Sequence, residues 1–452
     1  MPRAPNTGDR PRRPNTQKPR AEYKPRPTVD PTTTKAPPVQ LRNYPGVVNI
    51  VLRPGTATPV LAGHPWIFSG AIQHVALQPG QVIVPGQACA VFDLHGRFLA
   101  HGCYNPNSQI AIRVVTPGQD GLEPDRIESA AELVVGRLNR AVDLRSALGL
   151  PSAQTNAYRL VNSEGDGLPG LVVDRFGDGA VVVTSSASAA LWLPHVIAWL
   201  NKEAKCAWVV TRVPQDIHPS EGLIAGNSTT HGNAPDRCEV AVNGLKLWVE
   251  PSGGQKSGMY CDQRENHLRV AEFAKDRFVL DAYSNTGGFG LHAARAGARK
   301  VRSVDASQRA IDLLSEHADA NHLSIQAEAA DAIHVLQHFA DAAESDKPDL
   351  VIVDPPKFAT KAGVLDQAIK KYTHLNTTAM RAVQAGGILV SCSCSGLVDR
   401  QSFLRVLGQS AHNAGKTVQL LEFRGAAADH PVAPAHMEGQ YLKVAICRIT
   451  AR

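Results

Sequence analysis

The sequence predicts an α/β protein in which a large, mostly parallel sheet follows two smaller units. Three observations support this fold class. In residues 251–452, apolar runs alternate with helix-like runs, which is typical of parallel strands joined by crossover helices. Residues 44–117 contain short strand-like runs separated by Gly, Pro and Asn, which indicates a small β-barrel. Residues 118–250 combine a long helix-like run with a hairpin signal, as in a mixed α+β unit.

The parallel-sheet region is organised around residues 278–297. The apolar run 278–280 ends on Asp281, a glycine-containing loop follows, and a helix-like run closes at Gly297. A loop at the carboxyl end of a parallel strand is where a nucleotide-like ligand binds. Gly287 and Gly288 have no side chains, so we expect the backbone to approach the ligand there. The loop is neither G-x-G-x-x-G nor a phosphate loop with Lys-Ser/Thr, so a dinucleotide and ATP are not the first expectation.

Polar or reactive side chains follow the other predicted strands of this region. The strand 299–304 ends on Asp305, where an acid accepts hydrogen bonds from ribose hydroxyls. Asp331 follows the next helical run. The last two strands end in the segments Asp354-Pro355-Pro356-Lys357-Phe358 and Ser391-Cys392-Ser393-Cys394-Ser395-Gly396. Because the carboxyl ends of parallel strands share one edge of a sheet, these groups predict a single site.

The order of these motifs resembles class I S-adenosylmethionine-dependent methyltransferases. Two further segments, 63–72 and 158–176, make residues 44–452 similar to the RlmI family, which methylates carbon 5 of a cytosine in large-subunit ribosomal RNA. The resemblance implies a Rossmann-like methyltransferase domain over 251–452, preceded by a PUA-like RNA-binding domain over 44–117 and a central α+β domain over 118–250. It also implies S-adenosyl-L-methionine as cofactor and ribosomal RNA as partner.

The resemblance assigns roles to particular residues. Asp305 would hold the ribose of the cofactor, and Asp331 the adenine amino group. Cys394 would be the nucleophile that adds to carbon 6 of the base, and Asp354 would bond the base edge; both would be catalytic. The remaining residues that we expect to contact the cofactor are Asp281, Ser284, Thr286, Gly287, Gly288 and Arg264, and those expected to contact the RNA are Lys357 and Phe358.

Several residues have alternative interpretations. Cys392 competes with Cys394, although the residue nearer the strand is more often part of the core. Arg264, Asp331 and Lys357 are compatible with a helix surface, a helix cap and a solvated lysine respectively. Trp66 either stacks on a base or fills the barrel with Phe68. Glu164 and Asp166 lie between glycines and are expected in a turn, and His430 is expected to be structural.

Charge is concentrated at the start of the chain. Residues 1–42 contain ten Lys or Arg and three acids, whereas the rest of the 452 residues contains 37 basic and 38 acidic groups. The Pro-rich segment 1–43 is too poor in large apolar residues to fold alone. We expect either a basic arm that attracts RNA phosphates or a solvated tail without a role.

Composition sets the remaining expectations. The chain has no apolar run of membrane-spanning length and no secretory signal, so a cytoplasmic protein is expected. Its eight cysteines are scattered; a lone C-x-C pair does not form a four-ligand zinc site, and no metal is expected. Reduced thiols are therefore expected. The sequence is compatible with a homodimer but does not determine the oligomeric state.

Two other functions remain open from the sequence. The Asp-Pro-Pro-Lys-Phe segment also resembles loops that N-methyltransferases use, so N-methylation of a guanine without covalent catalysis is one alternative. The other is a ribosome-assembly factor that binds RNA and performs no chemistry. The presence of Asp305, Asp354 and Cys394 argues against the second alternative.

Overall fold

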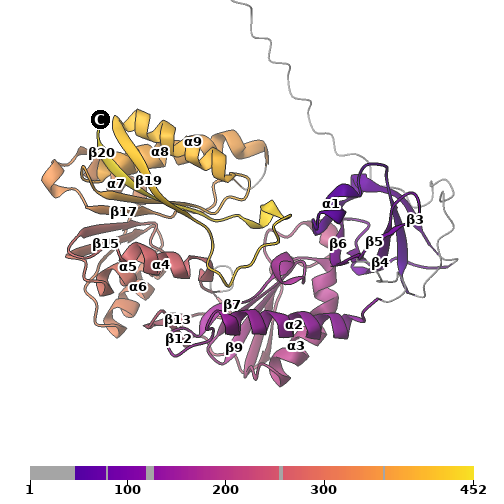
Figure 1. Cartoon of the computed structure of the whole chain (residues 1–452). Coiled ribbons are helices and arrows are strands. Elements are labelled where there is room, and N and C mark those ends of the chain that lie inside the picture. The colour runs from indigo at the N-terminus through magenta and orange to yellow at the C-terminus, as the bar shows by residue number, and fades with distance from the viewer. Residues whose placement is uncertain (1–45, 78–79, 119–126, 254–257, 360–361) are drawn as a thin grey trace, which may run out of the picture.

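A computed structural model describes residues 46–77, 80–118, 127–253, 258–359 and 362–452. Figure 1 shows three units, with the N-terminal barrel and the C-terminal domain joined through a central domain. The predicted tail 1–43, residues 119–126 at the start of the central region and residues 254–257 lie outside the described residues.

The N-terminal unit is a six-stranded barrel-like sheet of strand order β2-β6-β5-β4-β1-β3. Its elements are β1 (Val48–Leu52), α1 (Thr58–Leu61), β2 (Trp66–Phe68), β3 (Ile72–Ala76), β4 (Gln87–Phe92), β5 (Phe98–Tyr104) and β6 (Ile110–Pro117). One apolar run expected to be a strand of this unit, residues 81–84, is wrong, because these residues form no strand. The Val82 side chain is 80% exposed, while Ile83 packs partly against the barrel core. A β-branched apolar run alone does not make a strand where no partner edge is present.

Trp66 lies where the barrel meets the other two domains. Its indole Nε1 donates a 2.9 Å hydrogen bond to Glu164 of the central domain. The His436 ring of the C-terminal domain packs edge-on against the indole, with 4.4 Å between ring centroids. Phe68 is 49% exposed, so the expectation that it fills the barrel is wrong. Trp66 therefore contacts both other domains, whereas it was expected either to stack on an RNA base or to fill the barrel.

The central domain contains a five-stranded sheet of order β11-β10-β9-β8-β7 and two helices. Its elements are α2 (Ala130–Ala147), β7 (Ala157–Asn162), β8 (Leu171–Phe176), β9 (Gly179–Thr184), α3 (Ala187–Lys202), β10 (Trp208–Arg212) and β11 (Ser228–Gly232). Helix α2 begins at a capping box, in which Ser129 and Glu132 satisfy each other's backbone N–H groups. The hairpin predicted within 158–176 is confirmed by the antiparallel pairing of β7 with β8.

The turn of that hairpin connects the three domains. Asp166 accepts two hydrogen bonds, of 2.6 and 2.9 Å, from the guanidinium of Arg145. Glu164 bonds Trp66 of the barrel and lies 3.6 Å from Arg113. The prediction that both acids belong to a turn is thus confirmed. Gly165 has no side chain for a packing reason: a Cβ there would overlap the Pro431 carbonyl of the C-terminal domain.

A two-stranded hairpin joins the central and C-terminal domains. It consists of β12 (Cys238–Val242) and β13 (Leu245–Val249). The Trp248 ring stacks on His317 of the C-terminal domain with 5.7 Å between centroids. The backbone N–H of Trp248 donates a hydrogen bond to Nε2 of the same imidazole. Buried side chains of the hairpin also share one apolar cluster with both neighbouring domains.

The C-terminal domain is a doubly wound α/β sheet, as predicted. Its seven strands have the order β16-β15-β14-β17-β18-β20-β19, and only β20 runs opposite to the other six. The strands are β14 (Phe278–Ala282), β15 (Lys300–Asp305), β16 (Gln326–Ala329), β17 (Leu350–Val353), β18 (Ile388–Ser393), β19 (Lys416–Arg424) and β20 (Lys443–Ala451). The helices are α4 (Arg264–Ala271), α5 (Gly288–Arg295), α6 (Gln308–Ala320), α7 (Ala332–Asp341), α8 (Leu365–Ala382) and α9 (Arg400–Ala414).

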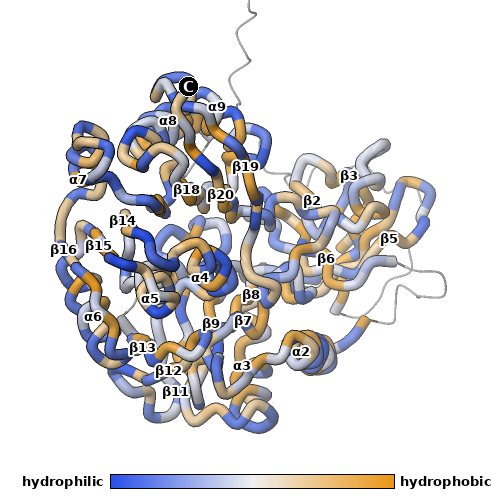
Figure 2. The backbone as a smooth tube through the Cα atoms, turned by 60° about the vertical axis from the view of Figure 1, so that its left-hand side comes forward, coloured by the Kyte–Doolittle hydropathy of each residue, from blue (hydrophilic) through white to orange (hydrophobic). Residues whose placement is uncertain are grey.

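Apolar side chains alternate between the two faces of this sheet. In β17, Val351 and Val353 face the cluster under α7, α8 and α9, whereas Leu350 and Ile352 face the cluster under α4 and α5. A parallel sheet covered on both faces requires continuous apolar strands, which is why these strands are visible in the sequence. Figure 2 colours hydrophobic stretches of the chain orange, for example along part of β7 in the central sheet.

The connection between β19 and β20 reaches across to the barrel, as the yellow loop in Figure 1 shows. It carries Asp429, which is fully buried and accepts hydrogen bonds or ion pairs from Arg264, His430 and the Arg159 backbone N–H. Burial alone would raise the pKa of Asp429, but these partners outweigh it and lower the pKa to about 2. His430 thus has the expected structural role.

Within the described ranges, no helix is both long and apolar enough to cross a membrane. All eight cysteines belong to the described chain and are free thiols, as expected.

Candidate active site

The carboxyl ends of four neighbouring strands lie level at one edge of the C-terminal sheet. Ala282 of β14 pairs with Val304 of β15 on one side and with Val353 of β17 on the other. Val353 in turn pairs with Ser391 of β18. The residues that follow these strands, including Asp305, Asp354 and Cys394, therefore gather at one edge, as the sequence predicted.

The loop after β14 has an unusual backbone. Tyr283, Asn285 and Gly287 all adopt positive φ, at 64°, 48° and 93°. Such conformations are unfavourable for residues with side chains and persist only where the surroundings hold them. Asp305 supplies that support, because one of its carboxylate oxygens accepts the Asn285 N–H at 2.9 Å and the other accepts the Ser307 N–H at 2.9 Å.

The two glycines of this loop are needed for packing. A Cβ on Gly288 would overlap the His267 imidazole of α4, and a Cβ on Gly287 would press on Leu314 of α6. Gly287 also has a left-handed backbone that favours glycine. These contacts give a packing reason for both glycines, and the close approach of a ligand to bare backbone stays a prediction.

Asp281 of β14 and Ser284 of the following loop are both buried. Asp281 is fully buried, and its Oδ2 accepts the Gly290 N–H at 2.8 Å. Within the described chain, Asp281 Oδ1 and the Ser284 hydroxyl are buried and have no hydrogen-bond partner. Burial raises the pKa of Asp281 to about 8; the Gly290 bond opposes this rise, and the nearby carboxylates Asp354 and Asp305 reinforce it. Buried polar atoms without partners are costly, so these two are available to a ligand.

Two expected cofactor residues already have protein partners. Asp331 is an exposed N-cap of α7 and accepts the Ile333 N–H at 3.1 Å, which matches the helix-cap alternative. It lies near Tyr283, where burial and the Asp331 charge raise the pKa of the phenol to about 12. Arg264 is buried and pairs with Asp429 at 3.2 Å, so it is not an ordinary surface arginine.

Asp354 is oriented by a chain of hydrogen bonds that sequence reasoning missed. Gln263 Nε2 donates to Asp354 Oδ2 at 3.0 Å, and Gln263 Oε1 accepts from Asn266 Nδ2 at 2.8 Å. Asn266 Oδ1 in turn accepts from Arg424 Nε at 2.9 Å. Because an arginine can only donate, each amide in the chain has one possible orientation. The Gln263 amide must therefore present N–H to Asp354, which favours the carboxylate form.

The two candidate nucleophiles, Cys392 and Cys394, differ in burial. Cys392 is the fifth residue of β18 and is 1% exposed. Burial, together with the nearby Asp354 charge, raises the pKa of its thiol well above the usual value. Cys394 follows the strand and is the one partly exposed cysteine of the eight. A buried thiol is a poor nucleophile, so this difference favours Cys394 over Cys392.

Ser395 ties the two loops of the site together. Its hydroxyl accepts the Ala359 N–H at 3.2 Å and shares a 2.9 Å hydrogen bond with the Tyr372 hydroxyl of α8. Phe358 packs against the Tyr372 ring, with 4.7 Å between centroids, whereas Lys357 is exposed. Of the two residues expected to contact RNA, Lys357 is thus the accessible one.

Comparison with known proteins identifies the family. Residues 50–117 match a PUA-like domain, and residues 226–431 match an S-adenosylmethionine-dependent methyltransferase domain. The ribosomal RNA large subunit methyltransferase I of Tolumonas auensis is 36% identical over 395 residues, which cover 86% of this chain and 96% of that protein. This chain belongs to the ribosomal RNA large subunit methyltransferase I family. The family member of Erwinia tasmaniensis is 35% identical over 408 residues, covering 89% of this chain and 99% of that protein.

Solved structures support the fold of the whole family chain. A proposed S-adenosylmethionine-dependent methyltransferase from Streptococcus mutans aligns with a TM-score of 0.73 at 18% identity, over 88% of this chain and 99% of that one. SMU.776, a proposed methyltransferase solved in complex with SAH, aligns with a TM-score of 0.74 at 18% identity and the same coverage. The predicted class of a Rossmann-like methyltransferase domain after a PUA-like domain is thereby confirmed.

The strand-end residues suit S-adenosylmethionine, the cofactor of this family. Asp281 Oδ1 and the Ser284 hydroxyl, both without partners in the described chain, match an amino-acid group that donates and accepts hydrogen bonds. Asp305 is only partly buried and lies at the end of the second strand, where a ribose diol is bound in such sheets. The expected cofactor therefore fits these residues.

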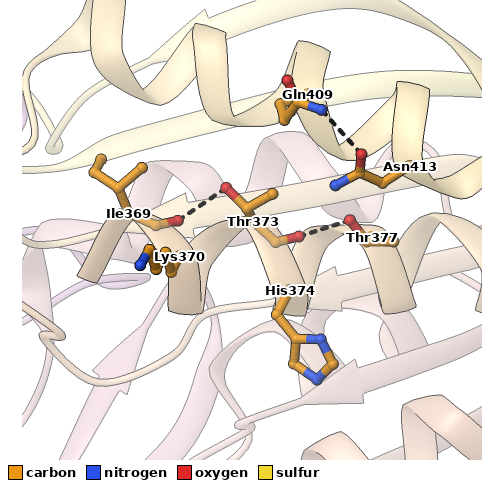
Figure 3. A pocket seen from close by; sticks show the side chains of 7 residues that line it. All are labelled: Ile369, Lys370, Thr373, His374, Thr377, Gln409 and Asn413. Carbon is orange, nitrogen blue, oxygen red and sulfur yellow. Dashed lines mark hydrogen bonds between the residues drawn. The ribbon is translucent and has the colours of Figure 1, made fainter. Parts of the chain in front are cut away.

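A separate cavity of about 440 Å³ lies between α8 and α9, away from the strand-end residues. Figure 3 shows its lining residues, of which Thr373 and Thr377 donate to backbone carbonyls of their own helix. Gln409 and Asn413 bond each other at 2.9 Å. Because these four side chains already have hydrogen-bond partners within α8 and α9, they do not indicate a ligand.

Proposed function

We propose that this family member methylates carbon 5 of a cytosine in large-subunit ribosomal RNA through a covalent bond to Cys394. The relatives are named for methylation of that RNA, and the choice of base, atom and mechanism is our inference. The observation that carries it is the burial of the cysteines: seven are buried, and the partly exposed one follows β18 beside the β17 loop that holds Asp354.

The chemistry of the base explains why a cysteine is needed. Carbon 5 of cytosine is too weak a nucleophile to be methylated directly. A bond from Cys394 Sγ to carbon 6 makes carbon 5 electron-rich. Carbon 5 then forms a bond to the methyl group. Its proton is lost to water as the Sγ–carbon 6 bond breaks, which regenerates the cysteine. S-adenosylmethionine, when bound, supplies the methyl group.

The remaining residues of the site position the reactants. Asp354, held as an acceptor by Gln263, is suited to bond the amino group at the base edge. Asp281, Ser284, Thr286, Gly287, Gly288, Asp305 and Asp331 are proposed to surround the cofactor. Arg264, which pairs with Asp429, is also proposed to contact the cofactor. Lys357 is proposed to bind RNA phosphate. A paired cytosine has to leave its stack to reach Cys394, so we propose a loop or unpaired segment as substrate.

Product identity and covalent trapping test this proposal together. The protein is incubated with unmodified ribosomal RNA and methyl-labelled cofactor, and the digested nucleosides are analysed by mass spectrometry. We expect 5-methylcytidine. RNA containing 5-fluorocytidine carries fluorine where the proton must leave, so we expect a stable protein–RNA adduct that Cys394→Ala abolishes. The matched variant Cys392→Ala is expected to retain the adduct.

The outcomes separate the candidate functions. Label in a methylguanosine, with full activity of Cys394→Ala, would replace covalent catalysis by N-methylation at the Asp354 loop. Failure to bind S-adenosylmethionine in calorimetry would favour a non-catalytic RNA-binding protein. Asp305→Ala is expected to weaken cofactor binding about 10-fold or more, because hydrogen bonds to charged groups contribute about 1.5–3 kcal/mol.

A further inference from the structure

Lys443 is a buried lysine beside the nucleophile that the chemistry described so far does not use. It is the first residue of β20, and its side chain is only 3% exposed. Lysines are rarely this buried unless they are paired. Its Nζ donates 2.6 Å hydrogen bonds to the carbonyl oxygens of Ser395 and Tyr441.

Lys443 contacts the residues on both sides of Cys394. Its backbone pairs with Ser393 across the β18–β20 ladder, while its ammonium bonds the carbonyl of Ser395. The side chain therefore runs alongside the residue between them, which is Cys394. These contacts fix the turn that presents the cysteine after the strand ends.

The partners of the ammonium are neutral. Both recorded acceptors are carbonyl oxygens, and in the described chain no carboxylate lies within salt-bridge distance of Nζ. An ammonium has three N–H groups, so one remains after these two bonds. A buried cation with only neutral acceptors gains free energy from a nearby negative charge.

Three charged or titratable groups from different elements act on Lys443. Burial lowers the pKa of Lys443 to about 8; the Cys394 thiolate and Asp399, the N-cap of α9, oppose this effect, and Lys357 reinforces it. A lysine with this pKa exchanges protons near neutral pH. The negative charge of a Cys394 thiolate and the Lys443 ammonium therefore stabilise each other.

We propose that Lys443 activates Cys394 by holding the 394–395 turn and placing its ammonium beside the thiol, so that the cysteine reacts as a thiolate. This inference rests on the proposed role of Cys394. In the step, the Sγ–H bond breaks, the proton passes to water, and the Lys443 ammonium stabilises the thiolate that remains on Sγ. No oxidant or reductant is required. Lys443 is thus a positioning residue that acts through Cys394.

The reactivity of Cys394 toward iodoacetamide tests this proposal without RNA or cofactor. Alkylation at Cys394 is followed by peptide mass spectrometry from pH 5 to 10, and the seven buried cysteines serve as internal references. An opposite charge within about 4–6 Å shifts a pKa by about 1–3 units, so Lys443→Met is expected to slow alkylation at pH 7 by about tenfold or more. The midpoint of the pH profile is expected to move upward.

Two further variants separate charge from structure. Lys443→Gln keeps N–H donors for the Ser395 carbonyl but has no charge, so it is expected to behave like Lys443→Met. Lys443→Arg keeps the charge and is expected to retain most of the reactivity at pH 7. Lys370→Met, an exposed lysine on α8, is the matched control and is expected to leave the profile unchanged.

A pH midpoint that stays at the wild-type value in a folded Lys443→Gln or Lys443→Met protein would overturn the proposal. If Lys443→Met does not fold, the comparison of Lys443→Gln with Lys443→Arg decides, and equal profiles for those two would likewise overturn it. The outcome is independent of product identity. Methylguanosine as product would remove the covalent function but leave the measured coupling of Lys443 and Cys394 intact.

Discussion

Replacing Arg145 by Met is expected to destabilise the junction between the central and C-terminal domains. The side chains of Arg145 and Asp166 are 1% and 5% exposed, and two hydrogen bonds of 2.6 and 2.9 Å join them. Arg145 also donates to the carbonyl oxygens of Arg159 at 2.8 Å and Asp429 at 2.6 Å. Met fills a similar volume, so the substitution removes charge and hydrogen bonds and leaves little cavity.

The expected loss follows from the carboxylate that is left behind. Removing one partner of a buried ion pair costs about 3–5 kcal/mol, because the other charge remains buried without compensation. For a domain of 150–250 residues, 1 kcal/mol corresponds to about 2–4 °C in melting temperature. We therefore expect Arg145→Met to lower the melting temperature by about 6–20 °C.

Thermal melting followed by circular dichroism measures this effect. Arg140→Met, an exposed position on the same helix α2, is the matched control and is expected to stay within about 0.5 kcal/mol of wild type. Adding Asp166→Asn to Arg145→Met removes the unpaired charge, so the double variant is expected to recover part of the loss. A single variant within 1 kcal/mol of wild type, with no coupling to Asp166→Asn, would refute the reasoning.

Two other predictions concern the same junction. Gly165→Ala places a methyl group against the Pro431 carbonyl and is expected to cost about 1–3 kcal/mol of stability. Gly136→Ala is the control, because a Cβ there meets open space. Equal melting temperatures of the two variants would contradict the packing argument. Asp429 has a folded-state pKa of about 2, below its usual value of 3.8, so its contribution is complete above about pH 4 and lost as pH falls toward 2. That contribution to the free energy of unfolding is about 2 kcal/mol. In urea titrations from pH 6 to 2, Asp429→Asn is expected to remove this part of the pH dependence of the free energy of unfolding. The same pH dependence in wild type and variant would count against the argument.

The strand ends of the C-terminal sheet were predictable because a parallel sheet imposes a local pattern. Each strand is an apolar run that ends at a polar residue, so Asp281, Asp305, Asp354 and Cys394 are visible without knowledge of the tertiary structure. Local pattern was misleading at residues 81–84, where a β-branched apolar run lacks a neighbouring strand edge. Pairing partners are a property of the fold, and the sequence alone does not provide them.

The residues that escaped prediction act over long separations in the chain. Gln263 orients Asp354 from 91 positions away, and Asn266 receives its own orientation from Arg424, 158 positions away. Lys443 reaches the Ser395 carbonyl across 48 positions. An amide or lysine at these places has no local signature, because its role depends on which distant group the fold brings beside it.

The turn of the β7–β8 hairpin lies between the two outer units of the molecule. Through Glu164 it contacts the barrel, and through Gly165 it lies against Pro431 of the C-terminal domain. His436 adds a direct contact between these outer units at Trp66. On the proposed function, an RNA that binds the barrel while its target base reaches Cys394 has to extend from one outer unit to the other, so its folded shape contributes to what is selected.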